Sequence, residues 1–190
     1  VRRVLEDAGV GICCVTAYSK LSSPEDSDRS RQIDDIKRYV DLASDLGSPG
    51  VRTFFGGFPW YVYRQRVYDH AAEMLNTVAK GLESVRVLVE THDSMSAGED
   101  LEPLLARVDS PMIGVVWDMA HTSRAGEPLD RSWEILGHRV HHVHVKDEYP
   151  IGPHKLEHRI PGEGVVPLEQ VRDLLQANRF EGSVCLEWER

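Results

Sequence analysis

Short apolar runs alternate with longer segments of helical periodicity along the whole chain. Six runs have the length of strands and stay apolar on both faces, at residues 9–17, 50–57, 85–92, 112–119, 140–147 and 183–189. Apolar residues recur at helical spacing between them, at residues 29–46, 68–82, 97–108, 129–136 and 167–178. Strands of this kind separated by helices predict a parallel sheet covered by helices, in a single α/β domain over residues 1–190.

The alternation alone fits both an open doubly wound sheet and a closed barrel. No glycine-rich dinucleotide fingerprint follows the first run, although an open sheet of the Rossmann type would favour one. At least four runs end in acids or histidines, and barrels place functional side chains at the carboxyl ends of several strands. A complete (β/α)₈ barrel has eight strands and about 250 residues. We therefore expect an incomplete TIM barrel with about six strands, lacking the first two strands and the last helix.

The charge of the chain narrows the classes of partner. The net charge is −9, with 31 acidic and 22 basic residues, and an acidic surface repels phosphate backbones. No apolar run has the roughly 18–20 residues needed to cross a bilayer. The three cysteines, an odd number without regular spacing, are typical of reduced thiols in a cytoplasmic protein. We expect a cytoplasmic protein that binds neither nucleic acid nor membrane.

Four residues of types that bind metals lie at or near the ends of the last four predicted strands. They are Glu90, Asp118, His144 and Glu187. A strand-end glutamate is usually solvated and a lone histidine is usually packed or exposed, but three acids in phase within apolar runs carry a burial cost unless paired or metal-bound. Neighbouring strands lie about 4.8 Å apart, so the four side chains can converge. Three carboxylates and one imidazole suit one Mn²⁺, Mg²⁺ or Co²⁺ ion.

Five short motifs resemble a known family. They are VETHD at 89–93, WDMAH at 117–121, HVHVKD at 142–147, PGEG at 161–164 and LEWE at 186–189. In this order they resemble the xylose isomerase-like barrels, which include sugar isomerases and epimerases, inosose dehydratases and endonuclease IV. The resemblance spans residues 9–189, and it makes the first strand of this chain the third of the barrel.

The resemblance implies roles for individual residues. In the ketose 3-epimerases a Glu, an Asp, a His and a Glu hold the metal, and these fall on Glu90, Asp118, His144 and Glu187. The two glutamates are the acid–base pair in that branch.

Three more residues gain candidate roles in substrate binding. His121 and Arg159 match family residues that contact substrate oxygens, although the loop that carries Arg159 is longer than in the epimerases. Lys146 matches a residue beside the metal in inosose dehydratase-like members, but a solvent-facing lysine at a strand end is an equal alternative.

The implied activity is a metal-dependent isomerase or epimerase of a sugar or sugar phosphate. It would abstract a proton next to a carbonyl and pass through a cis-enediolate. An inosose dehydratase-like lyase that acts on a cyclitol is the main alternative, and a non-catalytic binding barrel is a weaker one. An endonuclease IV-like DNA repair enzyme is disfavoured, because FFGG at 54–57 lacks an expected histidine and EHR at 157–159 has Arg where that branch has His.

The remaining aromatic residues allow two interpretations, and two further histidines are not expected to bind the metal. An aromatic cluster, Phe55, Phe58, Trp60, Tyr61 and Tyr63, fits either a wall for the carbon face of a sugar or a contact, within its loop or between subunits of a homo-oligomer. His141 and His142 are not expected to be ligands, because one is out of phase with His144 and the other lies one layer deeper.

Overall fold

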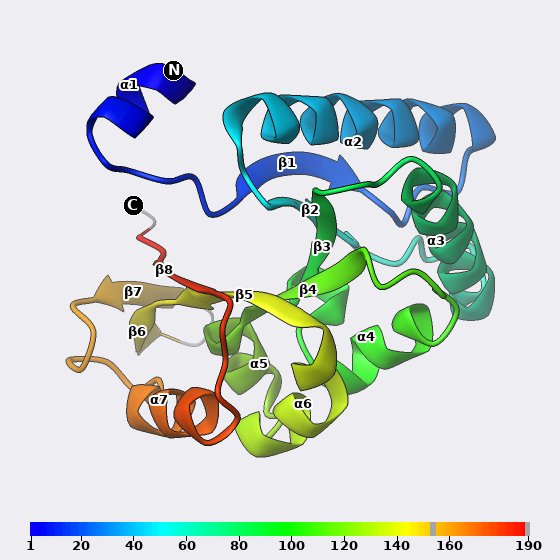
Figure 1. The fold of residues 1–190 in the computed structure, drawn as a ribbon. Helices are drawn as coiled ribbons and strands as arrows, with labels where there is room; N and C mark the ends of the chain where they lie inside the picture. The colour runs from blue at the N-terminus through cyan, green and yellow to red at the C-terminus, as the bar shows by residue number, and fades with distance from the viewer. Residues whose placement is uncertain (153–154, 189–190) are drawn as a thin grey trace.

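Six parallel strands form one curved sheet at the centre of the molecule (Figure 1). The computed structural model describes residues 1–152 and 155–188. The strands are β1 (Val15–Lys20), β2 (Gly50–Phe54), β3 (Arg86–Glu90), β4 (Ile113–Asp118), β5 (Val140–Val145) and β8 (Ser183–Leu186), in the order β1-β2-β3-β4-β5-β8. Within the described chain β1 and β8 are the two edges, so this sheet is the incomplete barrel that the sequence predicts.

Helices connect successive strands and cover the convex face of the sheet (Figure 1). They are α2 (Asp26–Leu46), α3 (Arg64–Ala79), α4 (Gly98–Leu105), α5 (Met119–Ala125), α6 (Leu129–Leu136) and α7 (Leu168–Ala177), with 3₁₀ turns η1 (Asp93–Met95) and η2 (Gly137–Arg139). A short helix, α1 (Arg2–Asp7), precedes β1 and has no buried residue. A parallel sheet with helices on its outer face is the architecture of a (β/α)₈ barrel. Over residues 1–152 and 155–188, no helix combines the length and the apolar character required to cross a membrane.

The two faces of each strand have different surroundings. Val87, Val115 and Trp117 belong to the main hydrophobic core, and the Trp117 ring lies 5.4 Å from that of Trp133 on α6. Side chains alternate along a strand, so the neighbouring residues face the interior of the incomplete barrel. Asp118 and Glu90 are on that inner face and are buried. The pattern of the strands therefore directs their acids inward.

The structure corrects several predicted boundaries. The first predicted strand, residues 9–17, is wrong at its start, because pairing with β2 begins at Val15 opposite Val51 and β1 then continues to Lys20. The fifth predicted strand ends at Val145, and an antiparallel hairpin of β6 (Asp147–Gly152) and β7 (Lys155–Arg159) follows it. The prediction missed this hairpin and also missed α5. The polar hairpin carries no apolar run by which the sequence could have shown it.

Candidate metal centre

The four predicted ligand residues meet at the carboxyl ends of four adjacent strands. Glu90 and Asp118 are the last residues of β3 and β4, His144 lies in β5, and Glu187 follows β8 directly. The register places Asp118 opposite His144, and the Glu187 backbone N–H donates to the Val145 carbonyl over 2.9 Å. One ligand atom from each of the four residues lies within 4.8 Å of the others. The pairing of the strands thus produces the convergence that the sequence predicts.

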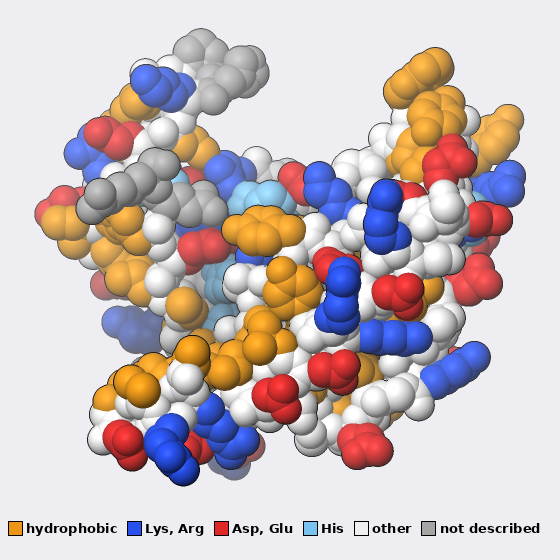
Figure 2. All heavy atoms as spheres, turned by 90° about the horizontal axis from the view of Figure 1, so that it is seen from above, with side chains coloured by type: hydrophobic (Ala, Val, Ile, Leu, Met, Phe, Trp, Pro, Cys, Tyr) orange, Lys and Arg blue, Asp and Glu red, His pale blue; other side chains and the backbone are white. Residues whose placement is uncertain are grey.

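Direct contacts join the imidazole to both glutamates. His144 Nδ1 lies 2.8 Å from Glu90 Oε1 and 3.5 Å from Glu187 Oε2. Three of the four side chains are buried, and that of Glu187 is 23% exposed. In Figure 2, histidine side chains are visible in the hollow between the two flanks of the molecule. The cluster therefore lies deep in the fold but remains reachable from one side.

The donor set fits a divalent metal ion. Three carboxylates and one imidazole offer oxygen and nitrogen atoms from four different strands, without a cysteine. Hard and borderline divalent cations prefer such ligands. A group of three acids buried this closely is costly unless a cation balances it. The composition and the geometry of the cluster are compatible with a divalent metal ion.

Lys146 is part of this cluster rather than a solvent-facing lysine. Its side chain is only 3% exposed, and its Nζ lies 2.7 Å from Asp118 Oδ2 and 2.8 Å from Glu187 Oε2. The lysine lies just after β5, two residues beyond His144, so both side chains point to the same side of the strand. The structure decides between the two alternatives for Lys146 and places its ammonium among the acids.

Arg52 is a second cation at the cluster, and the sequence prediction missed it. It lies in the middle of β2, and its Nη1 is 3.1 Å from Glu90 Oε2. Its guanidinium carbon lies 3.9 Å from the ring centroid of Phe54, which makes a cation–π contact. One signal in the sequence could have identified Arg52. It is a charged residue in an otherwise apolar run, at a position whose side chain faces the inner side of the sheet.

These contacts set the protonation of the two glutamates. Burial by itself raises the pKa of Glu90, but the hydrogen bond and charge of His144 and the charge of Arg52 outweigh it and lower the pKa. The pKa of Glu187 is lowered too, because Lys146 and His144 outweigh the effect of burial. Both glutamates are therefore carboxylates near neutral pH. The three acids correspondingly raise the pKa of His144 against the effect of burial.

Asp118 differs from the glutamates because it is the most deeply buried acid of the cluster. Burial raises its pKa to about 6, although Lys146 opposes this increase. Its other oxygen, Oδ1, accepts hydrogen bonds from the backbone N–H groups of Ala120 and His121 and so caps the N-terminus of α5. One side chain thus ends β4, begins α5 and faces the cluster.

His121 lies beside the cluster, as a substrate-binding role requires. Its Nε2 is 3.7 Å from Asp118 Oδ2, and its ring centroid is 4.2 Å from that of His92. Burial, followed by the charges of Lys146 and Arg124, lowers the pKa of His121 to about 2. A neutral imidazole is able to donate one hydrogen bond and accept another. Its role in substrate binding stays a prediction.

Arg159 lies farther out, on the hairpin. Its guanidinium pairs with Glu157 and lies 5.8 Å from the ring centroid of Tyr149. These partners are both hairpin residues, so the described contacts of Arg159 do not join it to the four-residue cluster. Its predicted contact with substrate stays a prediction.

Asp147 anchors the loop that contains the PGEG motif. Its Oδ2 accepts hydrogen bonds from the backbone N–H groups of Gly162 and Gly164, over 2.8 and 2.9 Å, and its Oδ1 accepts from Glu148 and Val166. A Cβ at Gly164 would lie 2.0 Å from Asp147 Oδ1, so only glycine fits at this position. The motif is therefore held against the end of β5, next to Lys146.

The predicted aromatic cluster divides into two parts. Phe55 is fully buried and packs on Phe58, with ring centroids 5.1 Å apart, so it belongs to the core rather than to a wall for substrate. Trp60 and Tyr63 are 94% and 89% exposed. The surface part of this cluster still fits either a sugar or a protein contact.

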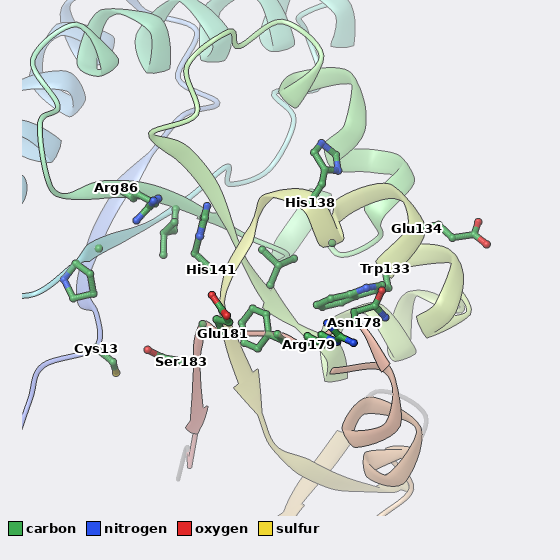
Figure 3. Close-up of a pocket in the computed structure, with 17 residues that line it drawn as sticks. Cys13, Arg86, Trp133, Glu134, His138, His141, Asn178, Arg179, Glu181 and Ser183 are labelled. Atoms are coloured by element: carbon green, nitrogen blue, oxygen red, sulfur yellow. The ribbon is translucent and has the colours of Figure 1, made fainter. Parts of the chain in front are cut away.

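A cavity lies at the opposite end of the strands (Figure 3). It measures about 900 Å³, and Gly50, Arg86, Val140 and Ser183 line it. These are the first residues of β2, β3, β5 and β8. Barrel enzymes bind substrate at the carboxyl ends of their strands, where the metal-ligand cluster lies. The cavity at the amino ends of the strands is therefore not the candidate active site.

Comparison with known proteins agrees with this architecture. The family model described as xylose isomerase-like TIM barrel matches residues 1–190. The chain therefore belongs to the xylose isomerase-like TIM barrel family.

Two curated relatives resemble the chain in sequence. An inosose dehydratase of Clostridium beijerinckii is 21% identical over 148 residues, which are 68% of this chain and 50% of the relative. A probable endonuclease 4 of Natronomonas pharaonis is 29% identical over 179 residues, which are 84% of this chain and 63% of the relative. The matches thus span about half to two thirds of these longer proteins.

Solved structures share the fold. A D-tagatose 3-epimerase-like protein superimposes with a TM-score of 0.82 at 21% identity, over 96% of this chain and 72% of that protein. The IOLI protein with a binding zinc atom has a TM-score of 0.82 at 16% identity, over 100% of this chain and 72% of that protein. At these identities the likeness shows the fold.

Proposed function

We propose that this protein is a divalent-metal-dependent isomerase or epimerase that acts on a small sugar by proton abstraction next to a carbonyl. The observation that carries the proposal is the pair of glutamates that both contact His144, each with a carboxylate oxygen within 3.5 Å of His144 Nδ1. Two carboxylates around one point are suited to remove a proton from one face of a carbon and return it to the other. The epimerase-like structural neighbour supports this reaction class.

In this proposal Asp118 and His144 would chiefly hold the ion, together with Glu90 and Glu187. When bound, a divalent cation offsets the negative charge that develops on the substrate oxygen as the proton leaves. We propose a single ion, because one group of His, Cys, Asp and Glu side chains over residues 1–152 and 155–188 is close enough to hold a metal. The zinc-containing neighbour supports a divalent metal.

The glutamates exchange protons with the substrate in this proposal. Both have a lowered pKa and are ready to act as a base. One carboxylate would remove the proton and leave a cis-enediolate, and the other glutamate, once it has taken up a proton, would return a proton to the opposite face of that carbon. Lys146, whose Nζ lies 2.8 Å from Glu187 Oε2, is able to supply the proton for the return. Burial and the neutral ring of His121 favour a hydrogen bond to the substrate oxygen rather than a proton transfer.

A dehydratase is the second candidate, and the position of Lys146 favours it. The Lys146 ammonium lies within 2.8 Å of both Asp118 and Glu187, so a leaving hydroxyl near the cluster could take a proton from it. Inosose dehydratases are among the curated relatives. Both candidates begin with the same proton abstraction, and they differ in whether water is lost afterwards.

Product analysis in D₂O separates these candidates. The protein, supplied with Mn²⁺, Mg²⁺ or Co²⁺, is incubated with ketoses, ketose phosphates and inososes, and products are identified by NMR. We expect deuterium at the carbon next to the carbonyl together with inverted stereochemistry or a moved carbonyl. Water loss from an inosose instead supports the dehydratase. Cleavage of DNA with an abasic site, without exchange in any sugar, contradicts both candidates.

A further inference from the structure

A groove of about 570 Å³ lies beside the metal-ligand cluster at the same end of the sheet. Loops and helices that follow β2, β3 and β4 form it, and its walls include Phe58, Arg64, Asp93, Asp100, His121 and Arg124. Its volume is within the range of small-molecule sites. The proposed chemistry at the cluster does not use most of these residues, so the groove is a candidate for a second part of the substrate.

His121 joins the groove to the cluster. On one side its Nε2 lies 3.7 Å from Asp118 Oδ2, and on the other its Nδ1 lies 2.8 Å from Arg124 Nη2. The same imidazole also lines the groove. A substrate with its reacting carbon at the cluster and its chain laid over His121 therefore reaches the groove.

The charges in the groove balance each other. Arg64 Nη2 lies 3.5 Å from Asp100 Oδ1, and Arg124 Nε lies 3.3 Å from Glu148 Oε1, so both arginines already face carboxylates. Asp93, the remaining acid of the wall, pairs with His92 rather than with an arginine. A phosphate in this space would meet two aspartates and would have to compete for cations that are already paired.

The other surfaces of the groove suit a neutral polar group. Ser94 and Ser96 add hydroxyl groups to the wall, and the guanidinium carbon of Arg64 lies 4.2 Å from the ring centroid of Phe58. The groove thus offers donors, acceptors and one stacked apolar surface. Sugars present hydroxyl groups on their edges and C–H groups on their faces, and these match such a lining.

We infer that this groove is a specificity subsite for the uncharged, hydroxyl-bearing end of the substrate and discriminates against a terminal phosphate. The inference rests on the proposed function for the position of the reacting carbon. It narrows the substrate class to unphosphorylated polyhydroxy compounds. Asp93 and Asp100 are the residues that exclude the phosphate.

A binding experiment with compounds that cannot react tests the subsite apart from the chemistry. Sorbitol and sorbitol 6-phosphate lack a carbonyl, and their binding to the Mn²⁺-supplied protein is measured by isothermal titration calorimetry. We expect sorbitol to bind about tenfold more tightly or better, because Asp93 and Asp100 oppose the phosphate while Arg64 and Arg124 are already paired with carboxylates. Equal or tighter binding of the phosphate overturns the inference, whether or not any sugar is turned over in D₂O.

Charge removal sharpens the test. In the double variant Asp93→Asn, Asp100→Asn the groove becomes net positive, and we expect the preference for sorbitol to fall about tenfold or to reverse. Asp93 has a φ of 51°, a conformation that asparagine also tolerates, so the variant should fold. Asp69→Asn is the control, because this exposed acid pairs with Arg107 outside the groove. An unchanged preference in the double variant contradicts the subsite.

Discussion

The two ends of the sheet differ in cavity volume and in chemistry, and the end with the larger cavity is not the end with the ligand cluster. The amino end has the larger cavity, about 900 Å³, but its lining lacks a cluster of ligand atoms among the described residues. The carboxyl end has a smaller groove, of about 570 Å³, next to three acids, a histidine, Lys146 and Arg52 in mutual contact. Chemistry in a parallel barrel therefore follows the direction of the strands, not the volume of the cavity.

Glutamates at the two ends of β8 give the largest expected contrast. Glu187 follows the strand and joins the cluster, whereas Glu181 precedes it and lines the amino-end cavity. We expect Glu187→Gln to lower kcat by about 10²–10⁴-fold, as loss of a general base does. Glu181→Gln should leave kcat unchanged. Turnover and circular dichroism of both variants test the contrast, and full turnover in Glu187→Gln would contradict the role of Glu187 as a general base.

Arginines on neighbouring strands provide the next contrast. Arg52 pairs with the buried Glu90, and removal of one partner of a buried pair costs about 3–5 kcal/mol. Arg86 lines the amino-end cavity instead. We expect Arg52→Met to lower the free energy of unfolding by about that amount, while Arg86→Met costs about 1 kcal/mol or less. Urea unfolding in EDTA measures the free energy of unfolding of both variants. Equal losses would show that the ion pair of Arg52 with Glu90 does not stabilise the fold more than Arg86 does.

Asp147 gives a smaller effect that depends on pH. Burial raises its pKa, but four backbone N–H bonds outweigh this and lower it. Because the folded pKa is below the unfolded value of about 3.9, the stabilisation is present above about pH 4 and lost as pH falls through the folded pKa. We expect Asp147→Asn to cost about 1–3 kcal/mol at pH 7.

The measurement for Asp147 is urea unfolding of both proteins from pH 7 downward in EDTA. The difference in the free energy of unfolding should shrink on acidification. A difference that is constant with pH would contradict a charged role for Asp147. Asp69→Asn is the matched control, since Asp69 is exposed and its only described ion pair is with Arg107.

Much of the fold and the cluster could be predicted from the sequence because both follow simple periods. Five of the apolar runs contain a whole strand each, and the first overlaps only the start of β1. Side-chain alternation placed Glu90, Asp118 and His144 on one face. Residues whose position depends on pairing between distant segments were harder. Arg52 is the one charged residue of its apolar run, and its place in the cluster follows only from its ion pair with Glu90 on the neighbouring strand.

Local structure near Asp118 and Lys146 also escaped prediction for physical reasons. Helix α5 begins directly after β4 because Asp118 itself caps it, so no loop residues between the two indicated the start of a helix. The direction of Lys146 depended on where β5 ends and the hairpin begins, and apolar periodicity does not define that point. The sequence therefore predicted the convergence of the three acids and the histidine better than the cations that face them.

Metal binding is the most direct test of the central claim that Glu90, Asp118, His144 and Glu187 form one metal site. Mn²⁺ is titrated into the EDTA-treated and dialysed protein, and free Mn²⁺ is followed by electron paramagnetic resonance. We predict one tightly bound ion per chain, unchanged in Glu181→Gln and weakened at least about 100-fold in Asp118→Asn and His144→Gln. The account is contradicted if the wild-type protein binds no Mn²⁺, or if it binds Mn²⁺ equally well after either ligand is replaced.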